Sequence, residues 1–220
     1  MPEEKHPNGW IVVDHIIPGV TAEMIDWWWV NMEKGYELWC PDEHKGFKWL
    51  VKPPLNGHIV AVQIATESID YGPVIDLRIE WVDPNLGTSE QKDFWTYEHL
   101  LTAGSTGAQP GSRAGVILSH QFEEIPGGCK MRSCMHGFGG PPPGREGSPS
   151  PFPPGPPLPH PSGKKPTGGG WRVHNIAEVS TFKAFLPALW GIWQAVPDPN
   201  INRKCSLKIK KEGSQIIYVQ

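Results

Sequence analysis

Two different periods in the hydrophobic positions of the chain predict two kinds of secondary structure. Residues 21–32, TAEMIDWWWVNM, carry the helical period. Thr21 is the expected N-cap, and Glu23 puts a carboxylate in the first turn, where the helix dipole favours negative charge. The side chains expected on one face are Met24, Trp27, Trp28 and Asn31. Three consecutive tryptophans add bulk outside that stripe, so we expect this helix to be contacted on more than one face.

A second helix is predicted over residues 174–193, HNIAEVSTFKAFLPALWGIW. Its apolar residues recur at spacings of three, four and seven, which is typical of a helix with one buried face. They are Phe182, Phe185, Leu186, Leu189, Trp190 and Trp193. Pro187 lies inside this pattern, and we expect it to kink the helix or to begin a new turn.

The middle of the chain alternates between apolar and polar residues, as half-buried strands do. Residues 58–69 and 74–82 are rich in valine, isoleucine and threonine and are separated by the turn sequence DYG, which predicts two antiparallel strands. Residues 114–128 predict a further strand that ends in a turn. Residues 89–101 fit either a strand or a short helix, and residues 1–20 are interpreted as an irregular lead-in.

Residues 137–170 differ in kind from the rest of the chain. They hold 12 prolines and 10 glycines in 34 positions, a composition that cannot sustain helix or sheet hydrogen bonding and has little apolar surface to bury. We interpret this stretch as a disordered insert. The expected organisation is a single domain over residues 9–195, interrupted by that insert, with a C-terminal tail over residues 196–220.

Composition and charge limit the binding partners and the cellular compartment that we expect for this protein. The formal charge is −3, so the chain has no general electrostatic attraction to nucleic acid or to an anionic membrane. No run of 18 apolar residues exists that could span a bilayer. The N-terminus lacks the pattern of a secretory signal, and the four cysteines form no CxxC pair, so we expect a cytoplasmic protein with reduced thiols. The 11 tryptophans suit a core that doubles as a cavity for a flat apolar ligand.

The candidate chemistry lies in three separate segments. His174 and Glu178 are four residues apart on a predicted helix, so both side chains project from one face and could bind zinc. His44 lies within the aromatic run YELWCPDEHKGFKWL, residues 36–50. Glu67 lies in a predicted strand with apolar neighbours, where an inward carboxylate would need a cation. Asp76 and Glu80 on the next strand are open to the same interpretation, whereas His58, His99 and His136 are expected to be surface or core histidines.

Two segments resemble one family. The sequences PGVTAEMIDWWW…YELWCPDEH and HNIAEVSTFKAFLPALW are similar to those of the 2,4-diacetylphloroglucinol hydrolase family, which includes phloretin hydrolases. Members share a tryptophan-rich helix, then a tyrosine and a WHPxDH element, and an HxxxE helix that runs into LAxFLPEL. The resemblance covers roughly residues 9–135 and 171–195.

The resemblance implies an α+β fold of the helix-grip, Bet v 1-like kind, in which a curved antiparallel sheet wraps a long C-terminal helix. It also implies one zinc ion per chain. The ligands carried over are His44, Glu67, His174 and Glu178, with Glu80 as a competitor of Glu67. The substrate-contacting residues carried over are Tyr36, eight residues before the ligand histidine, and His120, on the strand over residues 114–128.

Some positions depart from the family pattern. Cys40 replaces the first histidine of WHPxDH, and Phe47 replaces a polar residue after the metal histidine. Met135 replaces an aromatic residue that contacts the substrate phenol in the family, and the insert follows at once.

The implied activity is zinc-dependent hydrolysis of the carbon–carbon bond between an acyl group and a polyhydroxylated aromatic ring, as in an acylphloroglucinol. Zinc would lower the pKa of a bound water, while Tyr36 and His120 would assist the proton shift on the ring. Two alternatives are a non-catalytic binding protein for small aromatic or apolar ligands and an inactive family member damaged by the insert. The expected partner is a small aromatic substrate, with no nucleic acid or membrane, and the oligomeric state, a homodimer among the options, is left open.

Overall fold

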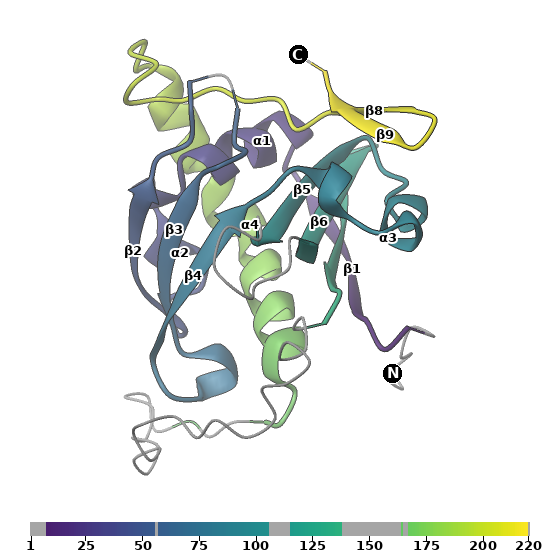
Figure 1. Cartoon of the computed structure of the whole chain (residues 1–220). Coiled ribbons are helices and arrows are strands. Elements are labelled where there is room, and N and C mark those ends of the chain that lie inside the picture. The colour runs from purple at the N-terminus through teal and green to yellow at the C-terminus, as the bar shows by residue number, and fades with distance from the viewer. Residues whose placement is uncertain (1–7, 56, 106–114, 138–163, 165–166, 220) are drawn as a thin grey trace.

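A computed structural model describes residues 8–55, 57–105, 115–137, 164 and 167–219 of the chain (Figure 1). The strands are β1 (Ile11–Pro18), β2 (His44–Val51), β3 (Val62–Glu67), β4 (Ile75–Trp81), β5 (His99–Ser105), β6 (Gly115–Ile125), β7 (Gly128–Met135), β8 (Ile209–Glu212) and β9 (Gln215–Tyr218). The α-helices are α1 (Ala22–Val30), α2 (Tyr36–Trp39), α3 (Ser89–Phe94) and α4 (Gly170–Gln194). Single 3-10 turns are η1 (Met32–Lys34), η2 (Ile69–Tyr71) and η3 (Pro84–Leu86).

Seven strands form one antiparallel sheet in the order β1-β7-β6-β5-β4-β3-β2. The order places β1 and β2, which are consecutive in sequence, at opposite edges, because the segment that holds α1 and α2 crosses from one edge to the other. The long helix α4 lies against this sheet, as Figure 1 shows, and packs most extensively on β1, followed by η2, α1 and α2. The fold is therefore the expected α+β arrangement of a large antiparallel sheet with a long C-terminal helix.

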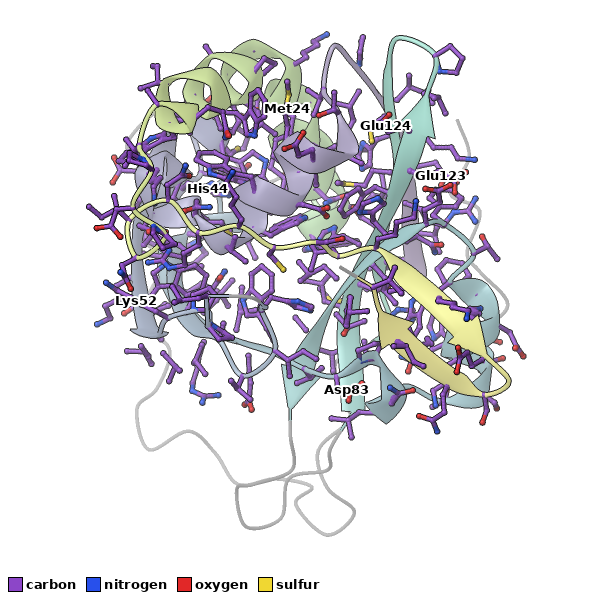
Figure 2. All side chains as sticks on the ribbon, turned by 90° about the horizontal axis from the view of Figure 1, so that it is seen from above. Met24, His44, Lys52, Asp83, Glu123 and Glu124 are labelled. Carbon is purple, nitrogen blue, oxygen red and sulfur yellow. The ribbon has the colours of Figure 1, made fainter. Side chains whose placement is uncertain are left out.

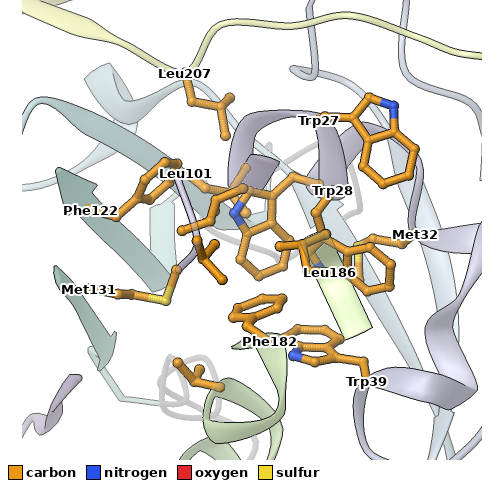
Figure 3. Packing of buried hydrophobic residues seen from close by; sticks show 14 of the residues in the cluster. Trp27, Trp28, Met32, Trp39, Leu101, Phe122, Met131, Phe182, Leu186 and Leu207 are labelled. Carbon is orange, nitrogen blue, oxygen red and sulfur yellow. The ribbon is translucent and has the colours of Figure 1, made fainter. Parts of the chain in front are cut away.

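The core forms where α1, α2 and α4 meet the sheet (Figure 3). Trp28 of α1, Trp39 of α2 and Phe182 of α4 are all almost fully buried. The rings of Trp39 and Phe182 stack at 5.3 Å, and Trp28 meets Trp39 edge-on at 5.5 Å. Aromatic pairs of this kind add to the stabilisation that burial of their surface gives. This cluster fixes α1, α2 and α4 to one another, and α4 carries two of the candidate site residues, His174 and Glu178.

The helices follow the periodicity of the sequence. Thr21 caps α1 as predicted, its hydroxyl oxygen accepting the backbone N–H of Met24 at 3.2 Å. The helix buries residues around most of its circumference, Trp27 and Trp29 included, as the tryptophan run indicated. The α4 helix continues through Pro187 to Gln194, so the new turn that was one of the two expectations does not begin at that proline.

One expectation about the elements needs correction, and the structure adds detail to two other segments. The lead-in is not irregular, since β1 pairs with β7 along its whole length. Residues 89–101 hold both alternatives in succession, the helix α3 and then the start of β5. The tail contains the hairpin β8–β9, and the buried Leu207 joins it to the core. Most of the predicted insert lies outside the described residues.

Among the helices of the described residues, none is long and apolar enough to cross a membrane.

Candidate metal centre

Local structure brings four of the predicted residues together in two pairs. His44 begins β2 and Glu67 ends β3, and the two are register partners in the antiparallel ladder, so their side chains are neighbours. His174 and Glu178 lie one turn apart near the start of α4 and share its sheet-facing side. All four are buried. In Figure 2 His44 lies in the interior, whereas Lys52 and Asp83 lie at the periphery.

The polar atoms of these four residues converge at similar separations. His44 Nε2 lies 3.6 Å from Glu178 Oε2 and 3.9 Å from Glu67 Oε1. His174 Nε2 lies 3.4 Å from Glu67 Oε2 and 3.6 Å from Glu178 Oε2. These separations are long for hydrogen bonds. Four donors at about 2.0–2.1 Å from a tetrahedral ion lie about 3.3 Å apart, close to the separations found here. His44, Glu67 and His174 are accordingly one of the groups whose ligand atoms could hold a metal ion.

The position of the proton on the His44 ring favours a cation between the four side chains. Its Nδ1 lies 2.9 Å from the carbonyl oxygen of Tyr36, and a carbonyl can only accept, so Nδ1 carries the proton. In the neutral ring Nε2 therefore presents a lone pair, and it is buried with no hydrogen-bond partner in the described part of the chain. A lone pair that faces two carboxylates is unfavourable unless a cation lies between them.

The charge balance supports a cation as well. Burial opposes the charged form of His174, but the carboxylates of Glu178, Glu43 and Glu67 outweigh it and raise the pKa of His174 to about 9. Burial also opposes ionisation of Glu178, but the charge of the neighbouring His174 helps to hold its pKa below the usual value. The site thus holds an excess of buried negative charge, which a divalent ion would neutralise.

Hydrogen bonds and ring stacking with neighbouring residues hold the side chains of Glu178, Glu67 and His44 in place. Glu178 Oε1 accepts the side-chain N–H of Asn175 at 2.9 Å, and Asn175 Oδ1 accepts from His15 Nε2 at 2.9 Å. The Tyr36 hydroxyl donates to Glu67, and the Tyr36 ring stacks on the His44 ring at 4.2 Å and 8°. Such contacts leave the remaining donor atom of each side chain turned toward the centre, as metal ligands require.

Glu80, the competitor of Glu67, is not part of this group. Its carboxylate pairs with Arg78 at 3.2 Å on β4. Asp76 accepts the hydroxyl of Thr66 at 2.6 Å in an exposed position. Of the three strand acids that the sequence left open, Glu67 alone faces the two histidines.

His120 and Tyr36 remain candidates for contact with a substrate. His120 is buried on β6, shares a hydrogen bond of 2.8 Å with Ser133, and stacks on Trp29 at 5.0 Å. Burial lowers the pKa of His120 to about 4, so its ring is neutral near pH 7. Burial and the Glu67 charge hold the pKa of Tyr36 well above its usual range, so its hydroxyl keeps its proton.

Sequence reasoning missed Glu43, which lies directly before His44 and is buried. Its carboxylate accepts the Nδ1 proton of His174. Cys40, Glu43 and His174 form a second group of metal-ligating atoms. Burial and nearby carboxylates raise the pKa of Cys40 to about 12, so its thiol stays protonated, and the other two members already bind each other. The first group is therefore the better metal site.

The histidines expected to be unrelated to the site lie apart from it. His99 Nδ1 donates to Asp26 at 3.0 Å, and His136 Nε2 lies 2.8 Å from the hydroxyl of Ser119. His58 is buried and lines a cavity of about 480 Å³ beside Cys205 and Tyr218, which includes none of the four converging residues.

Fold and site together define an α+β protein with a buried candidate metal centre of two histidines and two glutamates. The sequence profile of the DAPG hydrolase PhiG domain matches residues 4–191. The chain belongs to this family, and membership identifies it as a hydrolase. Among curated proteins, none matches the chain.

Two solved structures share weak similarity. One is a protein of Nitrosomonas europaea, 11% identical, covering 60% of this chain and 77% of its own, with a TM-score of 0.35. The other is an uncharacterized protein of Rhizobium leguminosarum, 15% identical, covering 57% of this chain and 73% of its own, with a TM-score of 0.32. Neither similarity carries an argument about fold or function.

Proposed function

We propose that this protein hydrolyses the carbon–carbon bond between an acyl group and a polyhydroxylated aromatic ring, with one divalent ion held by His44, Glu67, His174 and Glu178. The observation that carries the proposal is the convergence of these four side chains in a chain of the DAPG hydrolase family. Two imidazoles and two carboxylates are a donor set that suits zinc. When bound, the ion would lower the pKa of a water molecule and polarise the acyl carbonyl.

The buried aromatic residues suit the substrate ring. Trp29 stacks on His120 and meets Trp39 at 5.4 Å, while Trp39 meets His44 edge-on at 5.1 Å. A flat ring between such side chains would bury apolar surface on both faces, while its hydroxyl groups would reach the polar atoms around it. The substrate class that this favours is a hydroxylated aryl ketone.

The protonation states of His120 and Tyr36 suit the proton transfer that the reaction needs. The ring carbon that bears the acyl group must gain a proton, since a bare aryl carbanion is a poor leaving group. Neutral His120 can accept a proton from a ring hydroxyl, while the Tyr36 hydroxyl, whose proton is donated to Glu67, can accept a hydrogen bond from another ring hydroxyl. The protonated His120 would then return this proton to the ring carbon that bears the acyl group, which puts the ring in its keto form. Water oxygen adds to the acyl carbon, the carbon–carbon bond breaks, and its electrons pass to the ring as an enolate while the acyl group leaves as a carboxylate.

The test is an absorbance assay with acylphloroglucinols on the wild type and on His174→Ala. We expect turnover by the wild type and a loss of about two orders of magnitude or more in the variant, because the ion supplies several kcal/mol of transition-state stabilisation. Glu37→Gln, an exposed acid on α2, serves as the control and should leave turnover unchanged. Equal turnover by the wild type and His174→Ala would rule out the reaction at this site. Ligand binding without turnover would instead favour a non-catalytic binding protein.

A further inference from the structure

Glu43 lies at the junction of two parts of the metal centre that are far apart in sequence. Its carboxylate accepts the Nδ1 proton of His174, and the same oxygen accepts the backbone N–H of Asp70 at 3.3 Å. Its own backbone is held from both sides, since its N–H donates to Cys40 at 2.9 Å and its carbonyl accepts from Ser68 at 2.8 Å. Glu43 is 1% exposed. A carboxylate held this firmly can fix the group that donates to it.

Asp70 in turn holds the start of α4. Its Oδ1 accepts the backbone N–H of Thr167 at 3.0 Å and the Thr167 hydroxyl at 2.8 Å, and its Oδ2 accepts the N–H of Gly170 at 3.0 Å. The N-cap residue, Gly169, has no side chain to cap the helix, so Asp70 satisfies a free N–H group of the first turn from another element. His174 lies one turn further along the same helix.

The backbone of this turn is itself in an unusual conformation. Asp70 and the residue after it, Tyr71, both have positive φ, 50° and 57°. Two successive non-glycine residues in the left-handed region are unfavourable and persist only where the surrounding contacts impose them. At Asp70, the surrounding contacts are those to Glu43 and to the start of α4.

We propose that Glu43 is a positioning residue for the metal ligand His174, and that Asp70 acts with it as one unit. Glu43 holds Nδ1, so the ring cannot turn and Nε2 stays directed at Glu67 and Glu178. Asp70 holds the first turn of α4, so the backbone that carries His174 stays at a fixed distance from Glu43. The proposal rests on the metal centre of the proposed function, and nothing in it requires a particular substrate.

Two substitutions separate the geometry from the charge of Glu43. Glu43→Gln keeps an oxygen that can accept from Nδ1, whereas Glu43→Leu removes every acceptor. The matched control is Glu37→Gln, six residues earlier and exposed. The full chain is stripped with a chelator, and the affinity for Zn²⁺ is measured by competition with a chromophoric chelator. The absorption spectrum with Co²⁺ and the melting temperature of the stripped protein are recorded beside it.

We expect Glu43→Leu to weaken Zn²⁺ binding by about 10- to 100-fold and to change the Co²⁺ spectrum, with Glu43→Gln affected less. Glu37→Gln should match the wild type. Asp70→Asn should weaken binding too, and combining it with Glu43→Leu should add less than its separate effect, because both act on the same ligand. If the fold-losses of Zn²⁺ affinity from Asp70→Asn and Glu43→Leu simply multiplied in the double variant, the two residues would not act as one unit.

The proposal would be overturned if both Glu43 variants bound Zn²⁺ with the affinity of the wild type. It would also be overturned if Zn²⁺ affinity fell only in proportion to a lowered melting temperature of the stripped protein. A wild type that binds no divalent ion would overturn both the metal centre and the role of Glu43. A wild type that binds Zn²⁺ but hydrolyses no acylphloroglucinol would remove the proposed reaction and leave the role of Glu43 standing.

Discussion

At the scale of single residues, the buried indole N–H groups form two sets. Trp27, Trp81 and Trp95 donate to side chains, Asn202, Gln63 and Ser119 respectively. Trp28, Trp29 and Trp39 have buried N–H groups with no partner in the described part of the chain. A buried donor without an acceptor costs about 1–3 kcal/mol, so these three tryptophans carry a cost that their packing must offset.

Replacing Trp39 and Trp81 by phenylalanine should therefore have unequal effects. Trp81→Phe leaves the buried Gln63 oxygen without its donor at 3.1 Å, whereas Trp39→Phe removes a donor that bonds to nothing in the described structure. Both changes remove similar volume. We expect Trp81→Phe to lower the free energy of unfolding by about 1–3 kcal/mol more than Trp39→Phe. Urea denaturation of both variants measures this, and equal losses would count against it.

His58 should make the fold sensitive to acid. Burial lowers its pKa to about 3, against 6.5 in the unfolded chain, so between these values the unfolded chain binds a proton that the folded chain does not. The free energy of unfolding then falls as the pH drops below about 6.5, by up to about 1.4 kcal/mol per pH unit for this group. Urea denaturation between pH 6.5 and 4 should show a shallower pH dependence for His58→Leu than for the wild type. Parallel curves would contradict a neutral, buried His58.

At the scale of elements, α4 links the core to the candidate metal centre. His174 and Glu178 face the centre, and one turn beyond them Phe182 is fully buried against Trp39 and Trp28. The same face of one helix thus sets both the packing of the core and the position of two ligands.

Truncation of Phe182 should therefore be costly. We expect Phe182→Ala to lower the free energy of unfolding by about 3–5 kcal/mol, because it opens a cavity in a fully buried cluster. The control on the same helix is Ile192→Ala, at a side chain that is 70% exposed, which should change stability by less than about 0.5 kcal/mol. Comparable losses at the two positions would show that α4 does not pack as described.

The elements also show how far the sequence alone could lead. The helices α1 and α4 were predictable because their periodicity is local, and so was the pairing of β3 with β4 across a short turn. The edge strand β1 was missed because its partner β7 lies over one hundred residues away, and nothing near residues 11–18 reveals that pairing. The choice between Glu67 and Glu80 depended on register, which alternation of residues alone does not set.

The candidate metal centre was predictable in a similar, partial way. His174 and Glu178 are visible as an i,i+4 pair, and the resemblance to the family supplied His44 and Glu67. Glu43 occupies the acid position of the WHPxDH element, but the sequence could not show what it holds, because that atom belongs to a residue 131 positions later. Contacts of this kind exist only once the sheet and α4 are in place.

At the scale of the whole molecule, the candidate metal centre lies where one edge of the sheet meets α4. One ion held by the β2–β3 pair and by α4 would cross-link segments that are more than one hundred residues apart in sequence. A ligand that binds only the folded chain stabilises it by mass action.

Metal addition should accordingly stabilise the whole fold. We expect Zn²⁺ at about 100 times its Kd to raise the free energy of unfolding of the stripped protein by about 2.7 kcal/mol. His44→Ala, which lacks one ligand, should gain far less at the same concentration. Thermal denaturation with and without Zn²⁺ tests this, and an equal gain in the variant would place the bound ion elsewhere.

The most direct test of the four-residue centre is the metal content of the purified chain, measured by elemental analysis after dialysis. The account predicts about one divalent ion per chain in the wild type and almost none in His174→Ala or Glu178→Gln, with Glu37→Gln like the wild type. A wild type without bound ion, or variants at positions 174 and 178 that keep a full ion, would contradict it.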